Sequence, residues 1–379
     1  MAAQMRAYGG PACDPTLADT LARESINAVG WLGRLGVRWR SSASLWGGRW
    51  PRGFSAYPMR SGYEYVKVLL FALQRAGERA ELHLSTDVIE LVMEGGACRG
   101  VRIRRPNGVE HTVPASAVII ATGGFAANAD LVRRWVPAPE SDAPKTFDRR
   151  GRLFDGADGS GILMAQRIGA ALRGLENVLC VPYAGGKCVF RTGADIFLDA
   201  RGRRFVNEDA SFVKLRQAAA KLPNQTFWVV TDSQPFKGEY AEAKLIDGTL
   251  MTAGSVEDMA RAMNLDAQSL AKELRRYNAF VRRGRDDDFD KPVLANTIER
   301  PPFFFGRERM GLHATLGGIA IDAQARVLDR LGRPIPNLYA AGECTGGIHG
   351  REALGGALLT SAFVFGRIAG RSAAADALA

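Results

Sequence analysis

The residues best suited to chemistry lie in a Gly-rich block that begins at His313 and runs almost to the C-terminus. His313 opens the segment His-Ala-Thr-Leu-Gly-Gly-Ile-Ala-Ile-Asp, and Gly342 and Glu343 directly follow the apolar run Leu-Tyr-Ala-Ala. A carboxylate at a strand end can accept hydrogen bonds from the hydroxyl groups of a bound cofactor. The block therefore predicts a binding and reaction site.

Two earlier segments have a similar character but give weaker signals. The sequence Ala-Thr-Gly-Gly-Phe at 121–125 follows an apolar run. Glycines at the end of a parallel strand let backbone N–H groups approach a pyrophosphate or a flavin ring, although a plain turn is an equal alternative. Asp158 to Gly161 opens a helix whose N-terminal dipole favours an anion or a network of hydroxyl groups. The alternative for this segment is an ordinary helix cap.

Two further segments complete the set. The sequence Leu-Gly-Gly-Ala-Leu-Leu at 354–359 is expected to begin a helix that ends near Gly370. The free N–H groups of its first turn could face the pyrimidine end of a flavin, where negative charge develops on reduction. The sequence Gly-Arg-Arg-Phe-Val-Asn-Glu at 202–208 predicts a turn, a strand and a buried polar pair, with a functional role left open.

The elements that must position these residues follow from the spacing of apolar side chains. Helices are expected over 16–35, from a Ser61 cap to Gly77, over 161–172, and after the caps Ser255 and Asp266. Strands are expected at 81–84, 88–93, 100–104, 117–121 and 338–341. A helix followed by a small β-meander and a buried strand is typical of one half of an α/β nucleotide-binding domain.

The order of these elements predicts a mixed α/β fold with two domains. A discontinuous Rossmann-like domain would consist of residues 1–180 and 301–379. A smaller, more charged α+β capping domain would occupy residues 181–300.

Composition and charge exclude several classes of protein. The chain has 379 residues, of which 46% are hydrophobic and 24% charged, which excludes a disordered or coiled-coil protein. The net charge is +10, but Lys and Arg are scattered, so a small anionic ligand is favoured over nucleic acid. The longest apolar stretch, 353–365, is too short to span a membrane. Five irregularly spaced Cys and four dispersed His predict reduced thiols, no structural metal and a cytoplasmic location.

These motifs in combination resemble one superfamily of flavoproteins. ATGGF, GSGILMAQRIGA, GRRFVNE, HATLGGIAID, LYAAGECTGGIHG, LGGALL and FGRIAG are similar to segments of soluble fumarate reductases, flavocytochromes c, urocanate reductase and 3-ketosteroid dehydrogenases. The resemblance covers the chain from about residue 14 to the C-terminus. It implies FAD as cofactor, hydride transfer between flavin N5 and a substrate carbon, and a capping domain that closes over the substrate.

The resemblance also implies which residues serve these roles. His313 matches a substrate-facing histidine, Arg191 aligns with an arginine of the cap, and Arg351 and Tyr183 are further candidates for a positive charge and a proton donor. Residues implied to bind FAD are Val88, Thr122, Gly123, Gly124, Asp158, Gly159, Gly161, Gly342, Glu343, Gly355, Gly356, Leu358 and Leu359.

On the substrate side the chain departs from the fumarate reductases. Phe212 stands where they have a proton-donating Arg and where the ketosteroid dehydrogenases have a Tyr. Ala353 stands where they have an Arg that holds a carboxylate, and Val181 replaces a His that precedes a proline. Because a dicarboxylate needs bidentate Arg partners, we expect negligible fumarate reduction and leave the organic substrate and the flavin's redox partner unnamed.

The family's first section, a strand with GxGxxG, a helix and an acidic residue, has no counterpart in these residues. About seventy residues of the family pattern are therefore expected to be missing, and with them the pyrophosphate arm of the FAD site. An incomplete flavoprotein that needs a separate N-terminal segment is the alternative to a complete oxidoreductase.

Overall fold

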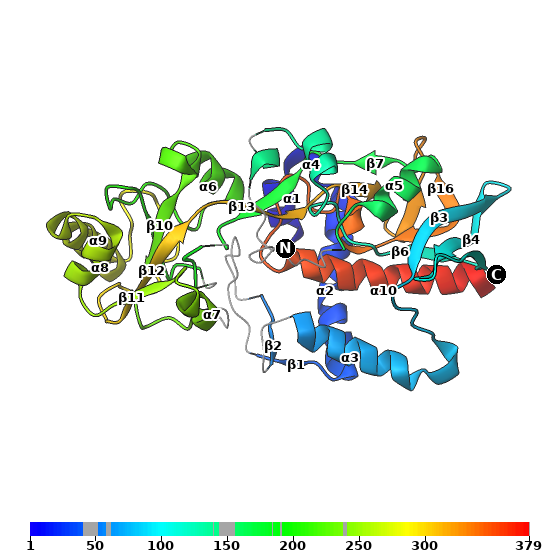
Figure 1. Ribbon diagram of the computed structural model, residues 1–379, viewed down its shortest axis with the longest axis horizontal. Helices are drawn as coiled ribbons and strands as arrows, with labels where there is room; N and C mark the ends of the chain where they lie inside the picture. Colours follow the sequence, from blue (N-terminus) through cyan, green and yellow to red (C-terminus); the bar gives the residue numbers. More distant parts are fainter. Residues whose placement is uncertain are drawn as a thin grey trace.

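Two lobes lie side by side along the long axis of the molecule (Figure 1). The structure is a computed structural model that describes residues 1–40, 52–57, 62–138, 140–143, 156–183, 185–189, 192–237 and 241–378. The larger lobe contains both ends of the chain, and the smaller lobe is built from residues between β8 (Val178–Val181) and β13 (Gly311–Thr315). These two antiparallel strands pair where the lobes meet. The chain leaves the larger lobe after β8 and returns to it at β13.

The larger lobe is organised around a long pair of helices. Asp14 accepts hydrogen bonds from the first N–H groups of the longer N-terminal helix, and Gly36, with φ 118°, ends it in the left-handed conformation. Figure 1 shows the C-terminal helix crossing the same lobe from its centre to its outer edge. The helices of this lobe are α1 (Ala2–Gly9), α2 (Pro15–Leu35), α3 (Gly62–Arg75), α4 (Ala129–Trp135), α5 (Ser160–Arg167) and α10 (Ala357–Leu378).

Small sheets complete the larger lobe. Two strands run parallel at its centre, and an antiparallel meander packs beside them. Besides β8 and β13, the strands are β1 (Arg38–Trp39), β2 (Ala56–Tyr57), β3 (Asp87–Glu94), β4 (Ala97–Arg104), β5 (Glu110–Pro114), β6 (Val118–Ile120), β7 (Leu172–Arg173), β14 (Gly318–Ala320), β15 (Arg326–Leu328), β16 (Pro334–Ala340) and β17 (Thr345–Gly346). Short 3₁₀ turns lie at 10–12, 77–79, 140–142 and 342–344 in this lobe, and another lies at 223–225 in the smaller lobe.

The smaller lobe is a four-stranded antiparallel sheet with helices around it. The strand order is β11, β12, β10, β9, and an apolar cluster that includes Leu270, Leu274 and Phe305 lies between the sheet and the last two helices. The strands are β9 (Ile196–Leu198), β10 (Phe227–Thr231), β11 (Met251–Ala253) and β12 (Phe303–Glu308); the helices are α6 (Phe212–Ala219), α7 (Ala241–Ile246), α8 (Val256–Met263) and α9 (Ala267–Arg283).

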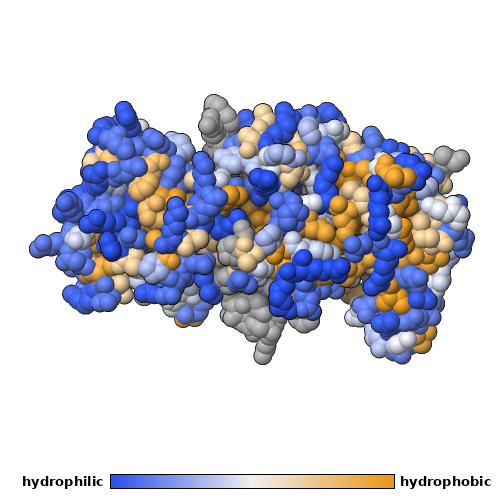
Figure 2. Space-filling view, turned by 90° about the horizontal axis from the view of Figure 1, so that it is seen from above, coloured by the Kyte–Doolittle hydropathy of each residue, from blue (hydrophilic) through white to orange (hydrophobic). Residues whose placement is uncertain are grey.

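The surface differs between the two lobes. Figure 2 shows hydrophobic residues gathered over the larger lobe, whereas the smaller lobe is mostly hydrophilic on the same face. Exposed apolar side chains of the larger lobe include Val88, Val113 and Ile119. None of the helices in the described ranges has the length and apolar character that crossing a membrane requires.

Most of the predicted elements are confirmed, with four corrections. Residues 81–84 form no strand. The helix predicted over 161–172 ends at Arg167, because Gly169 adopts φ 89° and turns the chain into β7. The C-terminal helix begins at Ala357, later than predicted, and continues to Leu378. The strand predicted within 202–208 is absent, and only an isolated bridge joins Arg204 to Leu198.

Candidate functional site

The predicted site residues at 122–124 and 342–343 lie at neighbouring strand ends. β6 and β16 are parallel, with Val118 opposite Leu338 and Ile120 opposite Ala340. The carboxyl ends of parallel neighbours open at the same edge of a sheet. The structure therefore brings together two segments that are more than two hundred residues apart in the sequence.

Thr315 connects this strand-end site to β13. Oε1 of Glu343 accepts hydrogen bonds from the backbone N–H of Thr315 at 3.0 Å and from its hydroxyl at 3.2 Å. A Cβ on Gly124 would lie closer than 3.0 Å to both the Thr315 hydroxyl and the Glu343 carboxylate. Glycine at 124 is thus required by the close approach of two side chains, which is a stronger reason than a simple turn.

The start of α5 packs directly on the end of β6. A Cβ on Gly161 would clash with Thr122 and Ile120, and one on Gly159, whose φ is 80°, would clash with Leu131. Oδ1 of Asp158 accepts the N–H of Ser160 at 2.8 Å and so holds the first turn of the helix. These contacts give the two glycines and Asp158 a structural role, and their predicted contact with a cofactor stays a prediction.

An apolar cavity lies beside the start of α10. Its volume is about 460 Å³. Leu359 faces it, whereas Leu358 packs against the main apolar core. The walls come from the glycines before α10 and the first turns of α10, from one face of α2, and from aromatic residues of β1, α3 and the segment between them. The residues include Gly355, Gly356, Ile26, Val29, Leu32, Trp39, Phe54, Tyr65 and Phe363.

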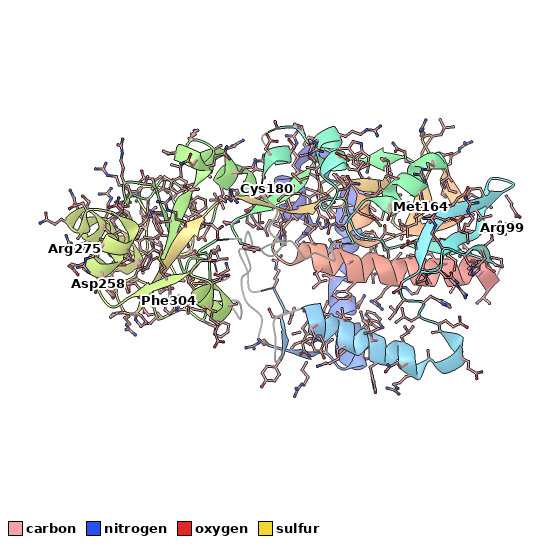
Figure 3. All side chains as sticks on the ribbon, viewed as in Figure 1. Arg99, Met164, Cys180, Asp258, Arg275 and Phe304 are labelled. Carbon is pink, nitrogen blue, oxygen red and sulfur yellow. The ribbon has the colours of Figure 1, made fainter. Side chains whose placement is uncertain are left out.

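His313 lies at a bulge in the strand pair that joins the lobes. The register between β13 and β8 shifts between Leu312 and Ala314, which leaves His313 as the extra residue. Bulges commonly re-aim a side chain near a functional site. Its ring meets the ring of Tyr183 edge to face, with centroids 5.5 Å apart and planes at 85°. Figure 3 shows Cys180 of the partner strand at this junction.

Burial sets the protonation of both rings. It lowers the pKa of His313 to about 4, so the imidazole is neutral at pH 7. Burial, and to a smaller extent the charge of Asp195, raises the pKa of Tyr183 far above its usual value, so the phenol keeps its proton. The pair can donate and accept hydrogen bonds without carrying charge.

Two buried charged residues, which the sequence analysis missed, hold the backbone that carries Tyr183. Nζ of Lys244 donates to the carbonyls of Tyr183 at 2.9 Å, and of Gly185 and Lys187 at 2.7 Å each. Glu308 accepts the N–H groups of Gly185 at 2.7 Å and Lys187 at 3.2 Å. One cation therefore satisfies the carbonyls of this crossover and one anion satisfies its amides. In the sequence, Lys244 and Glu308 are single charged residues in charged segments, and nothing there indicates that they are buried or that they bind the same backbone segment.

The segment 202–208 contributes to a buried ion cluster. Arg204 donates to both oxygens of Glu208, at 2.8 and 2.9 Å, and to both oxygens of Asp286, at 3.1 and 2.8 Å. Nζ of Lys291 lies 3.2 Å from Glu208. Removing any one partner would leave a charge buried without compensation. The predicted buried polar pair is therefore part of a larger structural network.

Next to this cluster, Asp209 has one carboxylate oxygen that is unused. Oδ1 accepts the N–H of Gly193 at 3.0 Å, while Oδ2 is buried and has no hydrogen-bond partner among the residues that the structure describes. Burial raises the pKa of this carboxyl group. The only sequence signal for it is its place directly after the GRRFVNE motif.

Three other predicted residues lie apart from this group or outside what is described. Val88 is the second residue of β3, opposite Ile103 in the meander, and is exposed. Arg351 is exposed and donates its backbone N–H to the carbonyl of Gly9. Arg191 lies outside the described residues. In the described part of the chain there is no cluster of His, Cys, Asp and Glu suited to a metal, and all five Cys are free and buried.

Comparison with known proteins gives matches over nearly the whole chain. The model of the family described as FAD binding domain matches residues 1–359. A probable fumarate reductase of Shewanella frigidimarina is 30% identical over 379 residues, covering 96% of this chain and 62% of that protein. Urocanate reductase of Eggerthella lenta is 28% identical, covering 99% of this chain and 64% of that protein. The chain thus spans less than two thirds of the length of these relatives.

A solved structure matches as well. The open conformation of a flavocytochrome c3 fumarate reductase has a TM-score of 0.74 and 29% sequence identity, and the match covers 100% of this chain and 67% of that one. The structural match extends through both lobes.

Proposed function

The chain belongs to the FAD binding domain family of the fumarate reductase superfamily, its cofactor is FAD, and from this premise we propose that it transfers a hydride between the flavin and a carbon–carbon bond of an organic substrate. The observation that carries the proposal is that β13 contacts both the strand-end site and the junction of the lobes. Thr315 donates two hydrogen bonds to Glu343 at the strand-end site, and His313, two residues earlier, meets Tyr183 at the junction of the lobes.

The described residues fit the flavin half of FAD. The hydroxyl of Thr122 is buried without a hydrogen-bond partner among the described residues, where it packs against Gly161 near the start of α5. Thr122, Gly342 and Glu343 would hold the hydroxyl groups of the ribityl chain. The amides near Gly355 and Gly356 would face the pyrimidine end. When bound, FAD supplies the hydride chemistry.

His313 and Tyr183 would act on the substrate through neutral groups. A neutral imidazole can donate a hydrogen bond to a substrate carbonyl and polarise it. The phenol of Tyr183 keeps its proton at neutral pH and could deliver it to the carbon next to the one that takes part in hydride transfer. Arg191 and Arg351 are the residues proposed to supply positive charge to the site.

The experiment compares His313→Ala with His83→Ala. His83 is exposed and serves as the matched control. The FAD-loaded protein is reduced with light under anaerobic conditions, and reoxidation by unsaturated ketones and unsaturated acids is followed by flavin absorbance. Loss of a positioned acid–base group costs about a hundredfold or more in rate. His313→Ala should show that loss with its best acceptor, and His83→Ala should match the wild type. Equal rates for the two variants would contradict the role of His313.

A second candidate function follows from the edge of β6. In the described part of the chain, β6 pairs with β16 on one side only, and Ile119 is 40% exposed. Parallel strands are normally buried on both faces of their sheet. The chain could therefore be a flavin-binding piece that needs an added strand to hold the adenosine half. Titration with FAD and riboflavin separates the candidates: equal affinity favours the incomplete site, and an FAD affinity at least tenfold higher favours a complete one.

A further inference from the structure

Glu352 reaches from the loop before α10 to the first turn of α6 in the other lobe. Its Oε1 accepts the N–H of Phe212 at 2.6 Å and its Oε2 accepts the N–H of Val213 at 3.5 Å. The residue is only 6% exposed. The first N–H groups of a helix have no partner within the helix, and they favour binding of an anion. The Glu352 carboxylate therefore occupies an anion place, which we define as the N–H groups of Phe212 and Val213 at the start of α6.

The remaining donor of this turn is also used. The hydroxyl of Ser211 accepts the N–H of Lys214 at 3.3 Å. With Phe212 and Val213 bound by Glu352, the first three amides of α6 all bind side chains of the chain itself. An external carboxylate would find no free amide here unless it displaced Glu352.

The residues described around Glu352 are poorly suited to binding an anionic substrate. Ala353 is buried and apolar, and Phe212 packs into the main apolar core. Arg351 is exposed, with its backbone N–H on Gly9. Burial raises the pKa of the Glu352 carboxyl group, and the charge of Arg216, one turn along α6, opposes that shift. A substrate carboxylate at this position would meet a buried negative charge and an apolar wall.

We propose that Glu352 is a specificity-determining residue: its carboxylate occupies the anion place at the start of α6 and excludes substrates that carry a carboxylate at this end. As a statement about substrate choice, the inference rests on the proposed function. It assigns the site a substrate that is uncharged at this end, such as an unsaturated ketone or amide, whose carbonyl could accept hydrogen bonds from Tyr183 or His313.

The first experiment tests the anion place without flavin and without turnover. Thermal unfolding of the wild type, Glu352→Ala and Asp266→Ala is measured in rising acetate, with chloride as the control for ionic strength. Asp266 is the matched control because its carboxylate caps the exposed start of α9, on the N–H of Ser269 at 2.7 Å. Acetate should stabilise Glu352→Ala with an apparent affinity at least tenfold higher than for the other two proteins. Equal acetate effects on all three would overturn the proposal.

A second variant keeps the test decisive if Glu352→Ala does not fold. Glu352→Gln retains one oxygen for the Phe212 amide, removes the charge, and places an NH2 group, which cannot accept a hydrogen bond, where the second oxygen faces the Val213 amide. Its apparent affinity for fumarate, measured by the same unfolding assay, should be at least tenfold higher than that of the wild type. An unchanged fumarate affinity would overturn the exclusion by charge.

Turnover then separates this inference from the proposed function. In the FAD-loaded protein, the ratio of rates for a neutral enone over an unsaturated monocarboxylate should fall at least tenfold in Glu352→Gln. If neither acceptor reoxidises the flavin while the acetate result holds, the proposed function fails and the anion place stands. If both acceptors react with an unchanged ratio, the specificity role of Glu352 fails and the proposed function stands.

Discussion

Gly124 shows how one residue type can be dictated by its neighbours. A Cβ there would overlap the Thr315 hydroxyl and the Glu343 carboxylate, and the hydroxyl donates a hydrogen bond to that carboxylate. Gly124→Ala should therefore lower the free energy of unfolding by about 1–3 kcal/mol, the usual cost of overpacking. Gly254→Ala is the control, because nothing lies within 4 Å of a Cβ at that position. Urea unfolding should show a change within about 0.5 kcal/mol for the control; a similar loss in both variants would contradict the argument.

His349 should make stability depend on pH. It is buried, and Ser361 donates its hydroxyl to the carbonyl of Leu358, which leaves the Ser361 oxygen to accept from Nε2 of His349. Nδ1 then carries no proton and has no partner in the described part of the chain. Burial lowers the pKa of His349 to about 4, below the value of 6.5 in the unfolded chain. Stability is thus complete above pH 6.5 and falls as the pH drops towards 4.

The measurement compares the free energy of unfolding in urea at about pH 5 and about pH 7. One such histidine contributes up to about 1.4 kcal/mol per pH unit within that window. His349→Gln keeps a donor for Ser361 and should reduce the pH dependence, whereas exposed His83→Gln should not. A pH dependence unchanged in His349→Gln would refute the assignment.

At the residue scale, the sequence located the groups near the strand ends but not their partners. Gly123, Gly124, Gly342 and Glu343 stood out because they follow apolar runs. Thr315, which connects Glu343 to the rest of the site, is an ordinary threonine until the fold brings β13 beside the strand ends. Contacts between distant segments leave no local pattern in the sequence, which is why Lys244, Asp209 and Glu352 were missed.

At the scale of elements, α7 holds the backbone of Tyr183, Gly185 and Lys187 in the crossover between the lobes. Lys244→Met should leave three carbonyls without their donor and Glu308 without its nearby cation. Breaking a buried charge arrangement on one side costs about 3–5 kcal/mol, so the unfolding temperature should fall steeply. Lys272→Met, on the exposed face of α9, is the control and should stay close to the wild type. Equal unfolding temperatures for the two variants would show that the crossover is held by other contacts.

Elements with strong local signals were predicted well. The Asp266 cap and the stripe of Leu270, Leu274 and Tyr277 gave α9 its start and its buried face. The helix predicted over 161–172 was too long because apolar periodicity continues past Gly169, where backbone conformation decides the end. Residues 81–84 have a strand-like composition, but they pair with no strand among the residues that the structure describes. The proposed domain limits at 180 and 300 stay a prediction.

At the scale of the whole molecule, the two lobes share one apolar core. The main cluster joins Val181 and Leu312 of the larger lobe to Phe197, Phe212 and Phe227 of the smaller one. We expect both lobes to unfold in a single transition. Variants that retain only Trp135 or only Trp228 as the fluorescent reporter should give the same urea midpoint, in agreement with circular dichroism. Midpoints that differ between the two reporters would show that the lobes unfold independently.

The parallel pairing of β6 with β16 also has a consequence for synthesis on the ribosome. The Cys344 thiol donates to the carbonyl of Ile120, 224 residues earlier in the sequence. During synthesis, β6 therefore has no β16 to pair with until most of the chain has been made. Native contacts of such long range slow folding and leave apolar surface open for longer. Nascent chains halted before residue 330 should therefore remain bound to chaperones, and release should follow once α10 has emerged.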